Sequence, residues 1–240
     1  MSRLLIVCFA AVIFLSCASR RGEVHHTAYE SAPYVPYAPR FSRSNISVLD
    51  YQQKQEGRAL PRWVGAWLSG GEKALERLSA YSGKYCFIME QTAPSQEVLL
   101  RWMLGFQVER NFPTMAQSRV FRCWTEGLGA APDLLYGSYF EKLLRACRSA
   151  SWRGAMTDGV FWLLVRQNNS AAADSDAGYE ASDMEREGGV YCAIVLVVID
   201  KNVFQNELNA IFNSIVFDKN DSRAQTTAVS EAIDGFWTRF

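Results

Sequence analysis

Histidine is scarce in this chain, and its scarcity excludes several kinds of active site. Only His25 and His26 occur, side by side near the N-terminus. The rest of the chain therefore cannot supply the histidine of a Ser-His-Asp or Cys-His catalytic site, nor that of a histidine-containing zinc site. The pair itself could bind a metal ion. However, adjacent histidines in a segment without apolar periodicity are more typical of solvated chain, so we predict no metal site.

Other signatures of catalysis and of nucleic-acid binding are missing as well. No Gly-rich spacing of the Walker or Rossmann type occurs, so we predict no phosphate loop and no bound cofactor. No C-x-x-C spacing occurs, which argues against a zinc knuckle or a thioredoxin-type redox pair. The 25 basic and 25 acidic residues give a net charge of zero. Without a basic excess we expect no nucleic-acid partner.

The apolar run at the N-terminus is too short to span a bilayer. It comprises the 11 residues from Leu4 to Phe14 and follows the positive charge of Arg3. At about 1.5 Å per residue the run covers roughly 16 Å, about half of the ~30 Å hydrocarbon core. A run of this length after a basic start is typical of a signal peptide. We therefore predict that residues 1–16 are a signal peptide.

A cysteine, Cys17, follows the predicted signal peptide directly. A small residue before a cysteine at this place resembles the lipobox of bacterial lipoproteins. The usual lipobox has leucine three residues before the cysteine and small residues at the next two positions. Here Phe14 and Leu15 occupy the first two positions and only Ser16 fits, which resembles the relaxed pattern of spirochaete lipoproteins.

This pattern predicts that Cys17 becomes the lipidated N-terminus of the mature protein. An anchor of two or three acyl chains, at about 0.8 kcal/mol per buried methylene, gives stable membrane attachment. The alternative is an ordinary cleaved signal peptide followed by an incidental cysteine.

Four further cysteines lie in the predicted folded part: Cys86, Cys123, Cys147 and Cys192. An even number in an exported chain permits two disulfides, with three alternative pairings. Each cysteine, however, lies in an apolar stretch, where a free thiol behaves as a small hydrophobic side chain. We favour four free, buried cysteines and keep the disulfides as the alternative.

The segment after Cys17, over residues 17–45, is predicted to be a flexible tether rich in Pro and Tyr. Pro33, Pro36 and Pro39 recur every third residue without an apolar period, which favours extended polyproline-like chain. As a flexible coil the tether would hold a domain on the order of 30 Å from the membrane. Alternatively, residues 34–37 pack on the domain surface. A folded domain is predicted over 46–215 and a C-terminal helical extension over 216–240.

The apolar patterning of residues 46–215 predicts an α+β domain, a small antiparallel sheet with helices packed on one face. Strands are predicted at 84–90, 160–166 and 189–200, with a long exposed loop over 168–188 between the last two. Pro61–Val64 is predicted to be extended, Gly70-Gly71 to form a turn and Pro113 to end or break a helix. Helices are predicted at 72–78, from the Ser95 N-cap to 106, at 114–125, from an Asp133 cap to 147, at 202–214 and within 223–240.

A stretch from about Tyr139 to Ile211 resembles small bacterial lipoproteins of the LPP20 type and related FlgT-like N-terminal modules. The matching residues are Gly154-Ala155, Phe161-Trp162 and the run from Tyr191 through Asp200 to Lys201. The resemblance covers about a third of the chain and implies a small α+β fold with helices on an antiparallel sheet. It implies no catalytic residues. The loop between the two strands is unusually long for this family.

Two residue sets leave other functions open. The carboxylates Glu90, Asp158, Asp200 and Glu207, near expected strand or helix ends, could form a glycosidase-like pair. The favoured interpretation is that Asp200 caps the following helix and Asp158 shapes a turn. A second set could line an apolar ligand pocket, although its spacing is more typical of core: Trp63, Trp67, Trp102, Trp124, Trp152 and Trp162.

These observations favour a non-enzymatic lipoprotein of the cell envelope. It would be anchored by lipid to the inner or outer membrane, with its domain in the periplasm, and would act as an interaction or structural module. Tethering would place the domain beside an envelope protein partner. The alternative is a lipoprotein that binds lipid or a small apolar ligand. The third and least favoured function is a carboxylate-dependent hydrolase.

Overall fold

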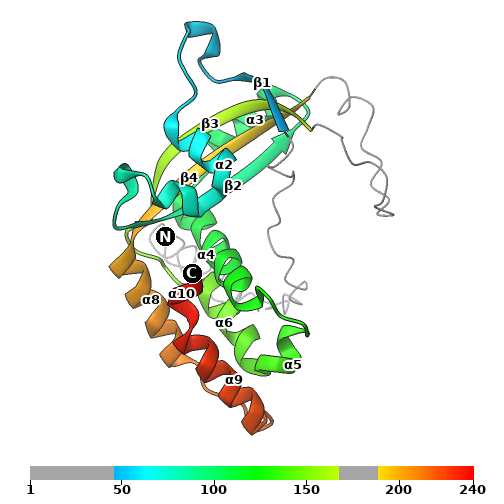
Figure 1. Ribbon diagram of the computed structural model, residues 1–240, viewed down its shortest axis with the longest axis vertical. Coiled ribbons are helices and arrows are strands. Elements are labelled where there is room, and N and C mark those ends of the chain that lie inside the picture. Colours follow the sequence, from blue (N-terminus) through cyan, green and yellow to red (C-terminus); the bar gives the residue numbers. More distant parts are fainter. Residues whose placement is uncertain (1–45, 168–188) are drawn as a thin grey trace, which may run out of the picture. The chain divides into compact units, whose positions relative to one another are not determined.

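The computed structural model describes residues 46–167 and 189–240 (Figure 1). These residues belong to one compact unit. The predicted signal peptide, Cys17, the histidine pair, the tether and the loop over 168–188 lie outside the described residues. What the sequence predicts for them therefore stays a prediction.

A four-stranded antiparallel sheet forms the centre of the described fold, which confirms the predicted α+β class. Its strands lie in the order β1-β3-β4-β2. Three of them match predicted strands, and β1, which was not predicted, is a half-buried strand of six residues whose Ile46 and Val48 pack against the core. The strands are β1 (Ile46–Tyr51), β2 (Lys84–Ala93), β3 (Met156–Gln167) and β4 (Val190–Asp200).

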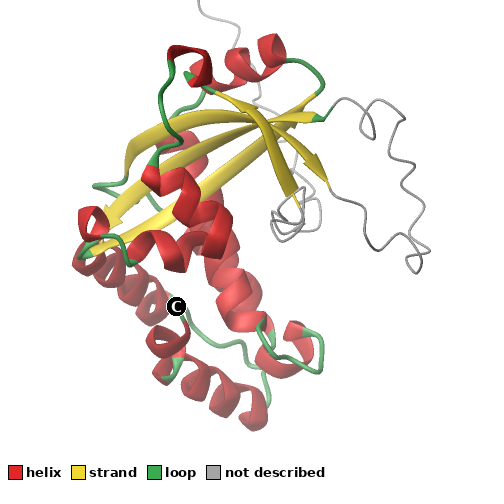
Figure 2. Cartoon of the chain, turned by 45° about the horizontal axis from the view of Figure 1, so that its top comes forward, coloured by secondary structure: helices red, strands yellow, loops and turns green. Residues whose placement is uncertain are grey.

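Helices cover both faces of this sheet, whereas the sequence predicted cover on one face. The central strand β4 is buried at every position from Cys192 to Ile199. Because successive side chains of a strand point to opposite faces, such a strand needs apolar cover on both sides. One face packs on α2 (Arg62–Glu76). The other packs on α4 (Val108–Thr125) and α8 (Lys201–Ser214), as Figure 2 shows.

Helix α2 corrects one prediction about its segment and confirms another. Of the stretch over 61–64 that was predicted to be extended, only Pro61 is extended, and it precedes the first helical residue, where its fixed φ and missing N–H are tolerated. The chain leaves helical geometry at Gly70-Gly71, where the sequence predicted a turn, and the resulting kink separates two helical parts of α2. Gly71 has φ 65° and ψ −153°, a conformation that only glycine adopts readily.

Helix α3 (Gln96–Leu104) begins as the sequence predicted. The Ser95 hydroxyl accepts a hydrogen bond of 3.4 Å from the Val98 amide. The prediction that Pro113 ends or breaks a helix is wrong, because the break between the two helices lies at Gly105 and α4 continues through Pro113. In its second turn the proline removes one backbone donor, and its buried ring packs in the core.

The predicted helix over 133–147 is two helices, α5 (Pro132–Tyr136) and α6 (Ser138–Ser149). They meet at Gly137, whose φ of 58° and ψ of −147° interrupt the helix. Ala131, and not Asp133, occupies the N-cap of α5. The split was hidden in the sequence because the apolar periodicity continues through Gly137.

Residues after Ser214 supply α9 (Arg223–Asp234) and α10 (Phe236–Arg239). Ser222 and Gln225 form a reciprocal capping box at the start of α9. Phe236 is fully buried, so this segment contributes to the core. Two short 3-10 helices, η2 (Lys54–Glu56) and η3 (Ser79–Tyr81), complete the described elements. Among the helices over 46–167 and 189–240, none is long and apolar enough to cross a membrane.

Candidate functional site

The predicted carboxylates do not all converge on one cleft. In the β2–β4 register Lys84 lies opposite Asp200 and Glu90 lies opposite Ile194. Glu90 and Asp200 are therefore six residues apart along the sheet, about 20 Å at ~3.3 Å per residue. The carboxyl groups of glycosidases lie within about 10 Å of each other. Glu90 and Asp200 consequently cannot act as such a pair.

The carboxylate of Asp200 caps α8, as the favoured interpretation predicted. It accepts hydrogen bonds from the amides of Asn202 at 2.8 Å and Val203 at 3.2 Å. Asp158 accepts a hydrogen bond of 3.0 Å from the Tyr81 hydroxyl. It lies where the β3–β4 register shifts, within a strand and not in the predicted turn. Glu207 lies within α8. Local structure thus uses both aspartates.

The tryptophans of the predicted pocket set are mostly core residues. Trp67, Trp124 and Trp152 are buried, and the other three are half-buried. The ring of Trp152 stacks on that of Phe204 with centroids 4.8 Å apart. A cleft of about 30 Å³ opens beside Trp152, between α4 and the residues that follow α6. That volume admits a few water molecules, whereas ligand pockets occupy about 300–1,000 Å³.

The four cysteines of the described residues are free and buried, as the sequence favoured. Burial, with the nearby Glu76 charge, raises the pKa of the Cys86 thiol to about 12. Burial also raises the pKa of Cys147 to about 12 and raises the pKa values of Cys123 and Cys192. All four are therefore protonated at neutral pH. Because the thiolate is the reactive form, none of them is poised as a nucleophile.

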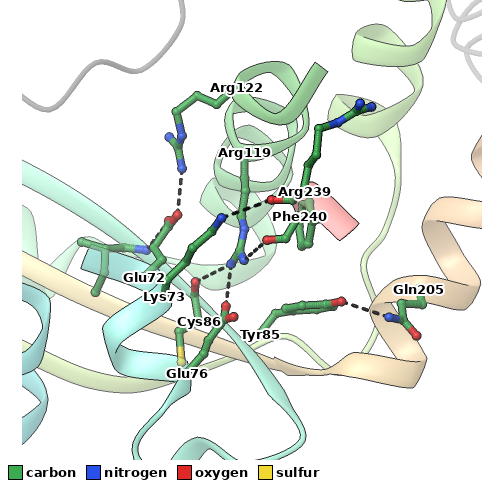
Figure 3. A network of polar contacts seen from close by, with 11 residues as sticks. Glu72, Lys73, Glu76, Tyr85, Cys86, Arg119, Arg122, Gln205, Arg239 and Phe240 are labelled. Atoms are coloured by element: carbon green, nitrogen blue, oxygen red, sulfur yellow. Dashed lines mark hydrogen bonds and ion pairs between the residues drawn. The ribbon is translucent and has the colours of Figure 1, made fainter. Parts of the chain in front are cut away.

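The most unusual polar arrangement surrounds Arg119 of α4 (Figure 3). The residue is only 5% exposed. Nη1 donates to Oε1 of Glu76 at 2.8 Å and to the carbonyl oxygen of Cys86 at 2.9 Å. Nη2 donates to the main-chain oxygen of Phe240 at 2.9 Å. Arg119 therefore connects α2, the edge strand β2 and the last described residue.

Three aromatic rings enclose the same guanidinium. Its central carbon lies 4.2 Å from the ring centroid of Phe240, 5.0 Å from that of Phe87 and 5.3 Å from that of Tyr85. Such contacts stabilise a cation most strongly where water is excluded. Because Arg119 is buried, its guanidinium is also poorly accessible to an external anion.

Two glutamates of α2 complete the arrangement along β2. Oε1 of Glu76 accepts a hydrogen bond of 3.0 Å from the Cys86 amide, and Oε1 of Glu72 accepts one of 3.4 Å from the Ile88 amide. Arg122 donates to Oε2 of Glu72 at 2.8 Å. Strand β2 lies at an edge of the sheet, where a free N–H or C=O is a template for pairing with another chain. Side chains of α2 and α4 form hydrogen bonds with main-chain groups of β2 instead. We call the residues that take part the β2 edge network: Glu72, Glu76, Cys86, Ile88, Arg119 and Arg122.

The electrostatics of the β2 edge network favour a permanently charged arginine. Burial alone lowers the pKa of Arg119, but the charges of Glu72 and Glu76 outweigh it, and the pKa lies above its ordinary value. Arg119 therefore stays charged near neutral pH. The geometry of the network suits structural closure of a sheet edge and provides no reactive centre.

The part of the chain that the structure describes contains no preformed metal site. No three His, Cys, Asp or Glu side chains there are grouped so as to hold a metal ion.

Searches against protein-family models, curated proteins and solved structures give no match to this chain. The resemblance to LPP20-type lipoproteins therefore stays a prediction from the sequence.

Sequence reasoning missed the β2 edge network altogether. One signal was present: Arg119 lies beside Val120 and Phe121, in a segment whose apolar residues predicted a buried helix face. A charge at such a position requires a buried partner. Glu72 and Glu76 are one helical turn apart and so lie on the same side of their helix, which indicated a negatively charged surface that could pair with Arg119.

Proposed function

We propose that this protein is a lipid-anchored, non-enzymatic module of the cell envelope. The observation that carries the proposal is a sequence pattern typical of a lipoprotein signal peptide: Arg3, the apolar run from Leu4 to Phe14 and the Ser16-Cys17 pair. Cleavage before Cys17 and acylation of its thiol would anchor the folded part to a membrane through two or three chains. The domain would lie in the periplasm and would act by binding or positioning another envelope component.

The described residues favour a binding or structural role over a catalytic one. Their cysteines are protonated, two predicted acid/base candidates serve local structure, and the β2 edge network is closed to substrates. The cleft beside Trp152, with a volume of about 30 Å³, is too small for a lipid and therefore does not support the alternative of a lipid-binding pocket.

Mass spectrometry of the protein purified from bacterial membranes tests this proposal. We expect an N-terminus at Cys17 carrying a diacylglyceryl group and an acylated amine. A Cys17→Ser precursor should lose both modifications and incorporate no labelled palmitate. An unmodified Cys17, or an N-terminus at another residue, would contradict the proposed anchor.

A further inference from the structure

Helix α3 and the turn after it carry several exposed apolar side chains. Leu104 is 89% exposed, Val98 50% and Leu100 40%. Leu100 and Leu104 are four residues apart, so they lie on the same side of the helix. The ring of half-buried Trp102 contacts that of half-buried Phe106, with centroids 6.0 Å apart. Val98 and Trp102, also four residues apart, lie on another side of the helix, and the exposed Glu97 and Arg101 lie between the two pairs. We call the five apolar residues the α3 patch.

The α3 patch is held firmly by the side of α3 that faces the sheet. Leu99 is fully buried and packs with Ala93 of β2 and Ala193 of β4. The only charges on the exposed turns of the helix are Glu97 and Arg101, which pair at 3.0 Å. The outer side of α3 therefore has no net charge, and the long Arg101 side chain can extend its charged end away from an apolar surface.

Helix α3 lies at the end of the sheet where β1 begins (Figure 1). Ile46, the first described residue, lies opposite Gln167, at the end of β3. Ala93, at the end of β2 just before α3, lies opposite Tyr191, near the start of β4. β1 and β2 are three strand spacings apart, which is about 14 Å. Ile46 and Ala93 therefore both lie at the same end of the sheet.

We infer that the α3 patch docks on the surface of the bilayer in which Cys17 is anchored. This inference rests on the proposed lipid anchor. The 28 residues from 18 to 45 separate Cys17 from Ile46, and a chain of that length spans at most about 100 Å. An anchor at Cys17 would thus keep this end of the sheet within reach of the membrane. Leucine with flanking tryptophan and phenylalanine is the side-chain chemistry of the bilayer interface.

Polarity-sensitive labels on the lipidated protein in phosphatidylcholine vesicles test the docking. Leu104→Cys carries the label in the α3 patch. Leu134→Cys is the matched control, because Leu134 is 71% exposed but lies on α5, which packs on α6 and α9. The native described cysteines are buried and should not react. We expect a blue shift at position 104, quenching by nitroxide on the acyl chains and loss of quenching by aqueous iodide. A label at position 134 should show no blue shift, no quenching by the acyl-chain nitroxide and full quenching by iodide.

Flotation of the vesicles separates failure of the anchor from failure of the docking. If the protein floats but the label at 104 stays accessible to iodide, the docking is wrong and the anchor stands. If the label is shielded from iodide but is not quenched by the acyl-chain nitroxide, a protein or a second copy covers the α3 patch, and the docking is also wrong. If the protein does not float, both proposals fail.

Discussion

At the scale of single residues, Arg119 shows how one buried charge can close a sheet edge. Its guanidinium neutralises Glu76, donates to the Cys86 carbonyl and packs among three rings. A buried ion pair contributes little compared with a well-packed apolar pair, but removing one partner leaves an uncompensated charge. The loss of Arg119 would therefore leave the Glu76 carboxylate almost buried without its cation.

Replacing Arg119 by methionine should destabilise the protein strongly. Glu76 would remain almost buried without its cation, and the Cys86 carbonyl would lose a donor. We expect the free energy of unfolding to fall by about 3–5 kcal/mol, measured by urea denaturation. The matched control is Arg122→Met, since Arg122 is 45% exposed in its pair with Glu72 and should cost less than about 1 kcal/mol. Equal losses for the two variants would contradict a special role for Arg119.

The carboxylate of Asp221 should make stability depend on pH. The backbone amide of Ser138 donates to it, and this bond, with one from the Asp218 amide, lowers its pKa below the ordinary 3.8. A carboxyl whose pKa is lower in the folded state stabilises the fold above its unfolded pKa and loses that effect as pH falls through the folded pKa. Asp221→Asn should therefore lower the Tm near pH 6.

The difference in Tm between the wild type and Asp221→Asn should shrink once the pH falls below about 4. Thermal melts of both proteins at a series of pH values measure it. Other carboxylates titrate in both proteins and cancel in the difference. A gap in Tm that is constant across the series would show that the charge of Asp221 does not contribute.

At the scale of elements, the junction of α5 and α6 depends on one glycine. Gly137 has a φ of 58°, and a Cβ there would collide with Oδ1 of Asp221. The same Asp221 carboxylate accepts from the Ser138 hydroxyl at 2.8 Å, at the start of α6. The missing side chain thus lets the segment before α9 bind the first turn of α6.

Gly137→Ala should therefore destabilise the fold by about 2 kcal/mol or more, through backbone strain and collision with Asp221. Gly65→Ala is the control within a helix, because no atom lies within 4 Å of the place that a Cβ on Gly65 would take. That change should stabilise α2 by about 0.4–1 kcal/mol. Urea denaturation gives both values. Stabilisation by Gly137→Ala would show that the junction does not require glycine.

At the scale of the whole described unit, the last helices share one core with the sheet. The ring of Phe236 contacts those of Trp124 at 6.5 Å and Phe212 at 5.2 Å between centroids. The main-chain oxygen of Phe240 binds Arg119 of the β2 edge network. These contacts connect residues far apart in sequence, so sheet and helices should unfold together.

Unfolding should accordingly be a single transition when followed by far-UV circular dichroism and by tryptophan fluorescence. Phe236→Ala should shift both signals together and cost about 3–5 kcal/mol. Phe217→Ala is the matched control, because Phe217 is 37% exposed and should cost clearly less. Two separate transitions, with only one moved by Phe236→Ala, would show that the C-terminal helices fold independently.

The features that the sequence determined by itself are local. Strands β2, β3 and β4 follow from compact apolar runs, and the caps at Ser95 and Asp200 follow from a side chain placed one turn before the amides that it binds. The predicted lipid anchor at Cys17 also depends on adjacent residues alone, and the described part of the chain does not test it.

The features that only the tertiary structure decided depend on partners that are distant in sequence. Arg119 reaches Glu76 across 43 positions and Phe240 across 121, and Gly137 is required by Asp221. The apolar patterns of α4 and of the α5–α6 segment gave no sign of Pro113 inside a helix or of the break at Gly137. At such positions packing against other elements outweighs the local secondary-structure preference. No local pattern shows which distant residue will pack there.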